Sequence, residues 1–377
     1  MSPVGQGFKI LQVGRSLALD RCVDLLIELG GEAVLVEVET GRVPPHPEHE
    51  TWRRARIGSF EVVAWDDRTA GMLSTWAAHA DVVVYDAESV FSRDLDRTLV
   101  DRHCVRCALR SGGAGGRRAG AAPTELTAQA ANGLMTITGF DDGPPTRAGF
   151  PVLTQVLALY AANAVMAAFY HRMLTAEAPQ AIDLSMDDVA TMLLAPFISR
   201  GKQGRDRLGN RHPVAAPWNA YPASDGEVVV CCGDDAQWQR LLGIVGRPDL
   251  RDCARTATVA DRVREVDYVD AQLRPWFASR TVGEAVAALD TAGIPAAPVL
   301  SVPQLLVDPQ YGGRAFQDRP AEHGRPASPR SIFGSPMDWS PAWVTAPTQP
   351  LQVVLERFGL PSMESQSMVA AGCFRAA

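Results

Sequence analysis

The amino-acid sequence lacks the features that direct a chain into or across a membrane. It has no uninterrupted run of about eighteen apolar residues, and its amino terminus has no short apolar region followed by a cleavage site. The seven cysteines are odd in number and irregularly spaced, which argues against the disulfide framework of a secreted protein. We therefore expect a cytoplasmic protein with no membrane partner.

Positive charge is in short supply. The chain has 36 Lys and Arg against 43 Asp and Glu, and its formal net charge is −7. A surface that follows nucleic-acid phosphates should be basic, so we expect no nucleic acid among the partners.

A complete set of metal ligands is missing as well. Cys104 and Cys107 form one Cys-x-x-Cys pair. A tetrahedral zinc site needs a second pair, and the adjacent Cys231 and Cys232 do not supply one with the usual spacing. We expect Cys104 and Cys107 to lie on a buried strand, and we expect no metal.

The sequence does contain enough apolar residues for a large core. Of its 377 residues, 46% are hydrophobic and 21% are charged, which is typical of a soluble protein with two domains. Residues 8–13 and 33–38 are predicted to be buried strands separated by a helix through 24–30. This order predicts a right-handed βαβ unit and a parallel sheet. Further strands are predicted at 61–65, 80–85, 105–109 and 181–185.

A long apolar helix is predicted to start at Pro151 and to run to about residue 173, after a loop rich in Gly and Pro. Its three/four spacing predicts one wide apolar face, made of Val152, Val156, Leu159, Tyr160, Ala164, Val165, Ala168 and Phe169. Residues 149–155 lie at a loop-to-helix junction, where backbone amides point at ligands. A buried scaffold helix explains the same pattern.

Several motifs around this helix resemble those of the family III CoA-transferases, a group of transferases and acyl-CoA racemases. They are Gln-Ala-x-x-Gly-Leu-Met at 129–135, Gly-Pro-Pro-Thr-Arg at 143–147, Gly149, Leu-Tyr-Ala-Ala at 159–162, a Gly-Asn-x-His-Pro signature at 209–213 and Ala-Gly-Ile-Pro-x-x-Pro-Val at 292–299. The resemblance implies an α/β fold with a Rossmann-like large domain, a parallel sheet, a smaller α/β domain and an interlocked homodimer. It also implies domain bounds: a large domain at 1–200 completed by 330–377, a linker at 201–220 and a small domain at 221–329.

One departure from the family pattern bears on the chemistry. The family's transferases have an aspartate nucleophile shortly after the Gly that matches Gly149, and this position aligns with Thr154, or with Leu153 if the register shifts by one. The aspartate carries first the acyl group and then CoA, which needs an ionised nucleophile. A threonine hydroxyl needs a general base, and no Ser/His/Asp arrangement is visible around Thr154 in the sequence. Transfer by the family's usual mechanism is therefore expected to be compromised.

The resemblance implies other site residues. Glu125 falls on an acidic position of the family and Asp235 aligns with an acid of the racemases, so the two are candidate acid/base groups for an α-carbon. As an alternative, Asp235 is simply favourable in the first turn of a helix. Candidate contacts to CoA or substrate are Arg15, Ala18, Asp86, Arg93, Gln129 and His212. Arg93 is equally explained as a solvated surface charge, and His212 as a clamp on the backbone beside Pro213.

These residues leave several functions open. The resemblance favours an enzyme that transfers CoA between carboxylic acids, or that acts on an acyl thioester by a modified mechanism. Its expected partners are an acyl-CoA, a small carboxylic acid and a second copy of the chain. The alternatives are an acyl-CoA racemase or isomerase, another specialised acyl-thioester enzyme, and a homologue that binds CoA without catalysis.

Overall fold

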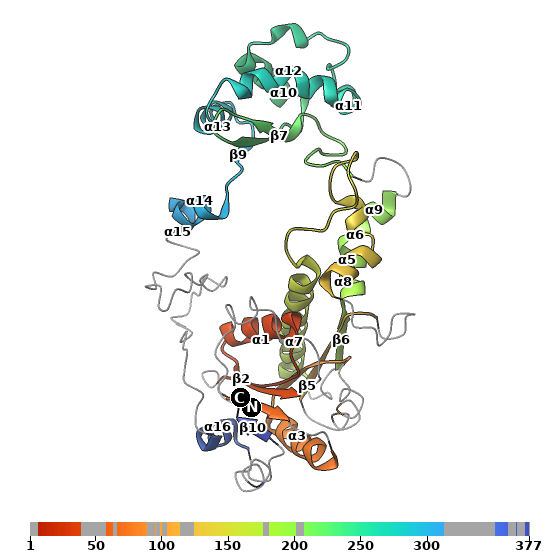
Figure 1. The fold of residues 1–377 in the computed structure, drawn as a ribbon, viewed down its shortest axis with the longest axis vertical. Helices are drawn as coiled ribbons and strands as arrows, with labels where there is room; N and C mark the ends of the chain where they lie inside the picture. The colour runs from red at the N-terminus through yellow and green to blue at the C-terminus, as the bar shows by residue number, and fades with distance from the viewer. Residues whose placement is uncertain are drawn as a thin grey trace. The chain divides into compact units, whose positions relative to one another are not determined.

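The structure is a computed structural model that divides into two units. Unit 1 comprises Met1–Leu134, Arg147–Lys202 and Asp318–Ala377, and unit 2 comprises Met135–Thr146 and Gln203–Gln317 (Figure 1). The residues described are 7–38, 58–62, 66–88, 95, 99, 104–113, 124–175, 181–200, 207–312, 351–360, 367 and 374–376. The domain bounds expected from the sequence remain a prediction.

Unit 1 is built on a seven-stranded sheet with the order β10-β3-β2-β1-β4-β5-β6. The strands are β1 (Lys9–Val13), β2 (Glu32–Val38), β3 (Gly58–Val62), β4 (Val82–Asp86), β5 (Val105–Arg110), β6 (Ala181–Ser185) and β10 (Phe374–Ala376). Neighbours among these described strands are parallel, except that β10 runs antiparallel to β3. The predicted βαβ start and the α/β class with a parallel sheet are confirmed.

Helices cover both faces of this sheet because its strands are buried on both sides. On one face, Ile10 of β1 packs with α1 (Leu17–Glu28) and α7 (Val152–Leu174). On the other, Leu11 belongs to a cluster with α3 (Asp67–His79) and α16 (Leu351–Phe358). The other helices of this part are α5 (Glu125–Ala131), α6 (Leu134–Ile137), which leads into unit 2, α8 (Met186–Leu193) and α9 (Ala195–Arg200).

Unit 2 contains a small antiparallel sheet of β7 (Trp218–Pro222), β8 (Glu227–Cys231) and β9 (Ala296–Pro298). Its helices are α10 (Asp235–Val245), η1 (Pro248–Leu250), α11 (Val259–Arg264), α12 (Val266–Ala278), α13 (Val282–Thr291), α14 (Val302–Val307) and α15 (Pro309–Gly312).

A buried carboxylate, Asp270, joins α12 to the sheet. It accepts hydrogen bonds from Arg211 (2.7 Å), Asn219 (2.9 Å) and the Tyr221 hydroxyl (2.6 Å), so its charge is compensated without water.

Helix α7 packs partly through the predicted face, because Val152, Val156, Val165, Ala168 and Phe169 all lie in or against the core cluster. The buried residues are Leu153, Thr154, Leu157, Ala158, Ala161, Ala162, Val165 and Ala168, whereas Leu159 and Tyr160 are exposed. The prediction was wrong for Leu159 and Tyr160 because α7 is apolar nearly all round, so periodicity alone does not fix the limits of the face that packs. Among the described residues, α7 is also the one helix long and apolar enough to cross a membrane by length and composition, a test that core helices of soluble proteins also pass.

Cys104 and Cys107 are buried at the start of β5 and on it, as expected. Burial raises the pKa of the Cys107 thiol from 9.0 to about 12, and the negative charge of Asp183 adds to this rise. No group of His, Cys, Asp and Glu that could hold a metal ion occurs among the described residues.

This shift predicts a loss of stability in alkali. The unfolded chain releases the Cys107 proton near its ordinary pKa of 9.0, whereas the folded chain retains it up to about 12. The stabilisation is therefore complete below the lower value and is lost as pH rises through the upper one, with a slope approaching about 1.4 kcal/mol per pH unit. Urea unfolding at a series of alkaline pH values should show a shallower decline for Cys107→Ala. The control Val105→Ala, on the same buried strand, should lower stability without changing the slope, and equal slopes in all three proteins would contradict the prediction.

Candidate active site

The amino-terminal end of α7 is capped by a side chain from another helix. Pro151 precedes α7 and supplies no side-chain acceptor for its first amides. Glu125, the first residue of α5, takes that role: the Leu153 amide donates to Oε1 at 3.0 Å and the Thr154 amide donates to Oε2 at 2.9 Å. A carboxylate suits this place because the helix dipole and the free amides both favour negative charge.

Two polar side chains complete the environment of this carboxylate. The Thr154 hydroxyl donates to Glu125 Oε2 at 2.6 Å, and the Gln129 amide donates to Glu125 Oε1 at 2.7 Å. Gln129 is buried, and its oxygen accepts a hydrogen bond from the Ala148 amide at 2.9 Å. We call Glu125, Gln129 and Thr154 the cap cluster.

The cap cluster brings together three residues that the sequence placed in separate hypotheses. In the sequence, Thr154 is a candidate because it aligns with the aspartate nucleophile of the family. Glu125 is a candidate acid/base group, and Gln129 is a candidate contact to CoA or substrate. The hydroxyl of Thr154 points at a carboxylate, but only 3% of Thr154 is accessible to solvent. Glu125 is intermediate in exposure, whereas Gln129 and Thr154 are buried, so it is the most accessible residue of the cluster.

The loop before Gly149 is hydrogen-bonded to the segment that contains Arg207 and Gly209. Arg207 donates to the carbonyl oxygens of Phe140 and Gly143, at 3.1 and 2.9 Å, and the Gly209 amide donates to Gly139 at 2.8 Å. Gly209 has a φ of +59° and lies against the Phe140 ring, so a Cβ at position 209 would clash with it. This close approach to Phe140 requires the glycine that opens the motif at 209–213. Arg207 was not singled out from the sequence, and nothing in its local pattern marks it.

The carboxyl ends of β1 and β4 form a second place suited to a ligand. These neighbouring strands continue in opposite directions across the sheet, and such a switch point is where open α/β sheets bind ligands. Gly14 lies beside Asp86 there and has a φ of +87°. Arg15 pairs with Glu37 at 3.1 Å, and Ala18 is buried in α1. The structure thus brings Arg15, Ala18 and Asp86 to one edge of the sheet.

Two candidate contacts to CoA or substrate remain, His212 and Arg93, and the structure describes only His212. The ring of His212 stacks on Trp218 with centroids 4.6 Å apart, and its Nδ1 accepts a hydrogen bond from the Val214 amide at 3.3 Å. This geometry is that of a backbone clamp. Arg93 lies outside the described residues.

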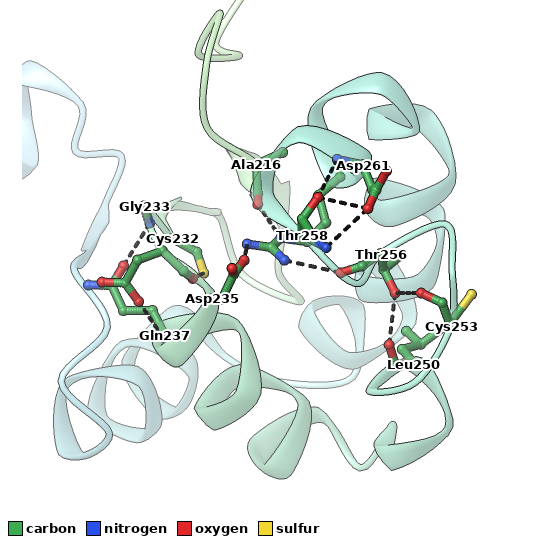
Figure 2. A network of polar contacts seen from close by, with 12 residues as sticks. Ala216, Cys232, Gly233, Asp235, Gln237, Leu250, Cys253, Thr256, Thr258 and Asp261 are labelled. Carbon is green, nitrogen blue, oxygen red and sulfur yellow. Dashed lines mark hydrogen bonds and ion pairs between the residues drawn. The ribbon is translucent and has the colours of Figure 1, made fainter.

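Asp235 is engaged in a structural ion pair. Its carboxylate accepts a hydrogen bond at 2.8 Å from Arg262, whose side chain is fully buried. Asp235 lies near Ala216 and Thr256 in this network (Figure 2). Arg262 also donates to the carbonyl oxygens of Ala216 and Thr256, so the guanidinium joins three segments of unit 2. A buried cation without its partner is costly, which explains an acid at position 235 without catalysis. The catalytic role of Asp235 remains a prediction.

Comparison with known proteins identifies the family. The family model for CoA-transferase family III matches residues 77–350, which is more than half of the chain. The chain belongs to CoA-transferase family III. Enzymes of this family use CoA thioesters as substrates, which agrees with the expected acyl-CoA.

Relatives and a solved structure cover most of the chain. It is 27% identical over 353 residues to the succinate–glutarate CoA-transferase of Agrobacterium fabrum, covering 85% of this chain and 86% of that protein. It is 28% identical over 358 residues to the succinyl-CoA:mesaconate CoA-transferase of Haloarcula marismortui, covering 87% and 88%. The fold resembles the crystal structure of a CAIB/BAIF family protein from Brucella suis, with a TM-score of 0.72, 24% identity and coverage of 89% and 92%. This last likeness supports the fold alone.

The cap cluster makes a prediction about local stability. Glu125→Gln replaces one acceptor oxygen by a donor that faces other donors, which should destabilise the start of α7 by about 1–3 kcal/mol. Amide hydrogen exchange should therefore speed up at Leu153 and Thr154. Glu284→Gln, which alters the capping box of α13 in unit 2, is a matched control that should leave these two amides unchanged. Unaltered exchange in Glu125→Gln would mean that the cap is dispensable.

Proposed function

We propose that this protein moves CoA from an acyl-CoA to a small carboxylic acid, and that dicarboxylic acids are its substrates. Membership of CoA-transferase family III supports the reaction class. The two relatives described above are named for succinate, glutarate and mesaconate, all of which are dicarboxylic acids. The observation on which the proposal rests is that the cap cluster holds the carboxylate of Glu125, a partly exposed residue, against position 154, where the family resemblance implies the nucleophile.

The edge formed by β1 and β4 is the proposed place for CoA. The switch point offers an open backbone at Gly14, and the polar Arg15 and Asp86 flank it. Gln129 and His212 are the other proposed contacts. In this proposal Gln129 acts by fixing the Glu125 carboxylate and the Ala148 backbone together. His212 acts by holding the turn at Val214, which precedes β7, and by stacking on Trp218.

The reaction class is tested by turnover. Purified protein is incubated with succinyl-CoA and either glutarate or mesaconate, and the thioesters are separated and identified by mass spectrometry. We expect glutaryl-CoA or mesaconyl-CoA to form together with free succinate. Exchange of the α-hydrogen of a branched acyl-CoA for deuterium without a new thioester would point to a racemase instead. Binding of CoA with neither reaction would point to a homologue without catalysis.

We further propose that the protein forms a homodimer through the exposed apolar side of α7 and the adjoining α8 and α9. This surface includes Tyr160, Tyr170, Met173, Leu174, Met192, Phe197 and Ile198, all exposed in the single chain. Tyr160 lies against Met192 at 2.8 Å, so α7 and α8 contribute to one surface. Apolar patches of this kind mark interaction sites on soluble proteins.

The dimer has its own test. Light scattering coupled to size exclusion should give twice the mass of the 40.5 kDa chain. A double change, Tyr170→Glu with Met173→Glu, should produce monomers because it buries charge in an apolar contact. Val353→Glu, an exposed position on α16, is the control and should leave the dimer intact. A monomeric unmodified protein would refute the assembly.

A further inference from the structure

The structure assigns the covalent step of CoA transfer to Glu125, in place of the aspartate that relatives are expected to have at position 154. This inference rests on the proposed transferase function and goes beyond it by naming the reacting atom. The evidence is the contact between the two positions. Thr154 Oγ1 lies 2.6 Å from Glu125 Oε2, so the side chain at the expected nucleophile position points directly at another carboxylate.

Threonine itself cannot replace an aspartate in this chemistry. An acylated hydroxyl is an ester whose only activated carbonyl belongs to the substrate, so CoA has no enzyme carbonyl to attack. A carboxylate does provide one, because its mixed anhydride can be attacked on the enzyme side. Thr154 is also almost inaccessible, and it already donates its proton to Glu125. Within the cap cluster only Glu125 has the required functional group.

The charge at the site favours the same assignment. The family resemblance implies two neighbouring acids in the transferases, one at position 125 and one at position 154, and this chain has only the first of them. With a threonine there, the cluster contains one carboxylate and a hydroxyl that donates to it. The site therefore retains a single carboxylate, supplied by α5 rather than by α7.

The donors around Glu125 are suited to the reaction. The amides of Leu153 and Thr154 are fixed by the helix, whereas the Thr154 hydroxyl can rotate about its side-chain bond. Rotation of the hydroxyl removes one of the two hydrogen bonds to Oε2 and frees one lone pair for attack on a thioester, while the Thr154 amide stays bonded to this oxygen. The fixed amides remain aimed at the carboxyl group and stabilise negative charge that develops on its oxygens.

The reaction balances with the two substrates alone. Oε2 attacks the thioester carbonyl, a C–O bond forms, the C–S bond breaks and CoA leaves as its thiolate. The thiolate attacks the Glu125 carbonyl of the anhydride, which releases the first acid with one oxygen from Glu125 and leaves a glutamyl-CoA thioester. The acceptor carboxylate then attacks this thioester, and the thiolate attacks the acceptor carbonyl of the new anhydride. The acceptor acyl-CoA leaves, and one acceptor oxygen remains on Glu125.

This exchange of oxygen is the test. The unmodified protein is incubated with succinyl-CoA and glutarate whose carboxylates contain heavy oxygen, then digested with trypsin and analysed by tandem mass spectrometry. We expect heavy oxygen at Glu125 within the fragment 119–147, which ends at Arg147. Asp141 and Asp142 lie on the same fragment and serve as internal controls that should stay unlabelled.

Variants separate the roles within the cluster. Glu125→Gln should reduce turnover on the order of a thousandfold or more, because it removes the group that forms the covalent bond. Thr154→Val removes only the hydroxyl, so it should slow turnover on the order of tenfold and still show heavy oxygen at Glu125. Circular dichroism and light scattering check that both variants are folded.

The outcomes distinguish this inference from the proposed function. Heavy oxygen at Glu125 supports both. Formation of glutaryl-CoA with an unlabelled Glu125 overturns the assignment and leaves the transferase function standing. Loss of the label in folded Thr154→Val would have the same two consequences. Absence of any new thioester, with succinate, glutarate and mesaconate all tried as partners, overturns the proposed function and this assignment with it.

Discussion

The hydrogen bonds between Glu125 and the first amides of α7 are the constraint on which the candidate site depends. A helix of 23 residues starts there with a proline that offers its amides no acceptor, and the carboxylate of α5 supplies one. The same carboxylate fixes Gln129, which in turn fixes the backbone of Ala148. Segments that are distant in sequence therefore share one bonded cluster, and the capping of α7 places a carboxylate beside position 154, which the family resemblance aligns with the nucleophile.

The parallel sheet could be predicted from the sequence because each strand is marked by a local pattern, a short apolar run. Short apolar runs such as 8–13 and 33–38, joined by one helix, have few alternatives to a parallel βαβ arrangement. The sequence predicted the packed face of α7 only in part, because apolar residues surround the whole helix and the limits of the buried face are set by packing against α1 and the sheet. The contact of Glu125 with Gln129 has a spacing of four within one helix and could have been predicted. The contact of Glu125 with Thr154 spans 29 residues and depends on how α5 packs against α7, which no local pattern encodes.

Unit 2 shows why an aligned acid is weak evidence for catalysis. Asp235 matches an acid of the racemases, yet its carboxylate neutralises the buried guanidinium of Arg262. Asp270 is likewise committed to Arg211, Asn219 and Tyr221. Burial next to this acid raises the pKa of Tyr221 well above its usual value, which keeps the phenol as a donor. In both cases the interior requires the charge, so the residue type follows from packing whether or not a substrate is ever bound.

The cap cluster has a structural role, which is to cap α7, and it also contains the residue to which we assign the covalent step. If Glu125 served only to cap α7, Thr154 would need no particular polarity, because the backbone amides alone satisfy that role. A hydroxyl that donates at 2.6 Å to the same oxygen instead adjusts the charge density on Oε2, the oxygen that also accepts the amide of residue 154. Replacing a carboxylate by a hydroxyl at this position removes a charge from α7 while leaving one on α5. In this chain the cluster therefore contains one carboxylate, supplied by α5 and held by the first amides of α7.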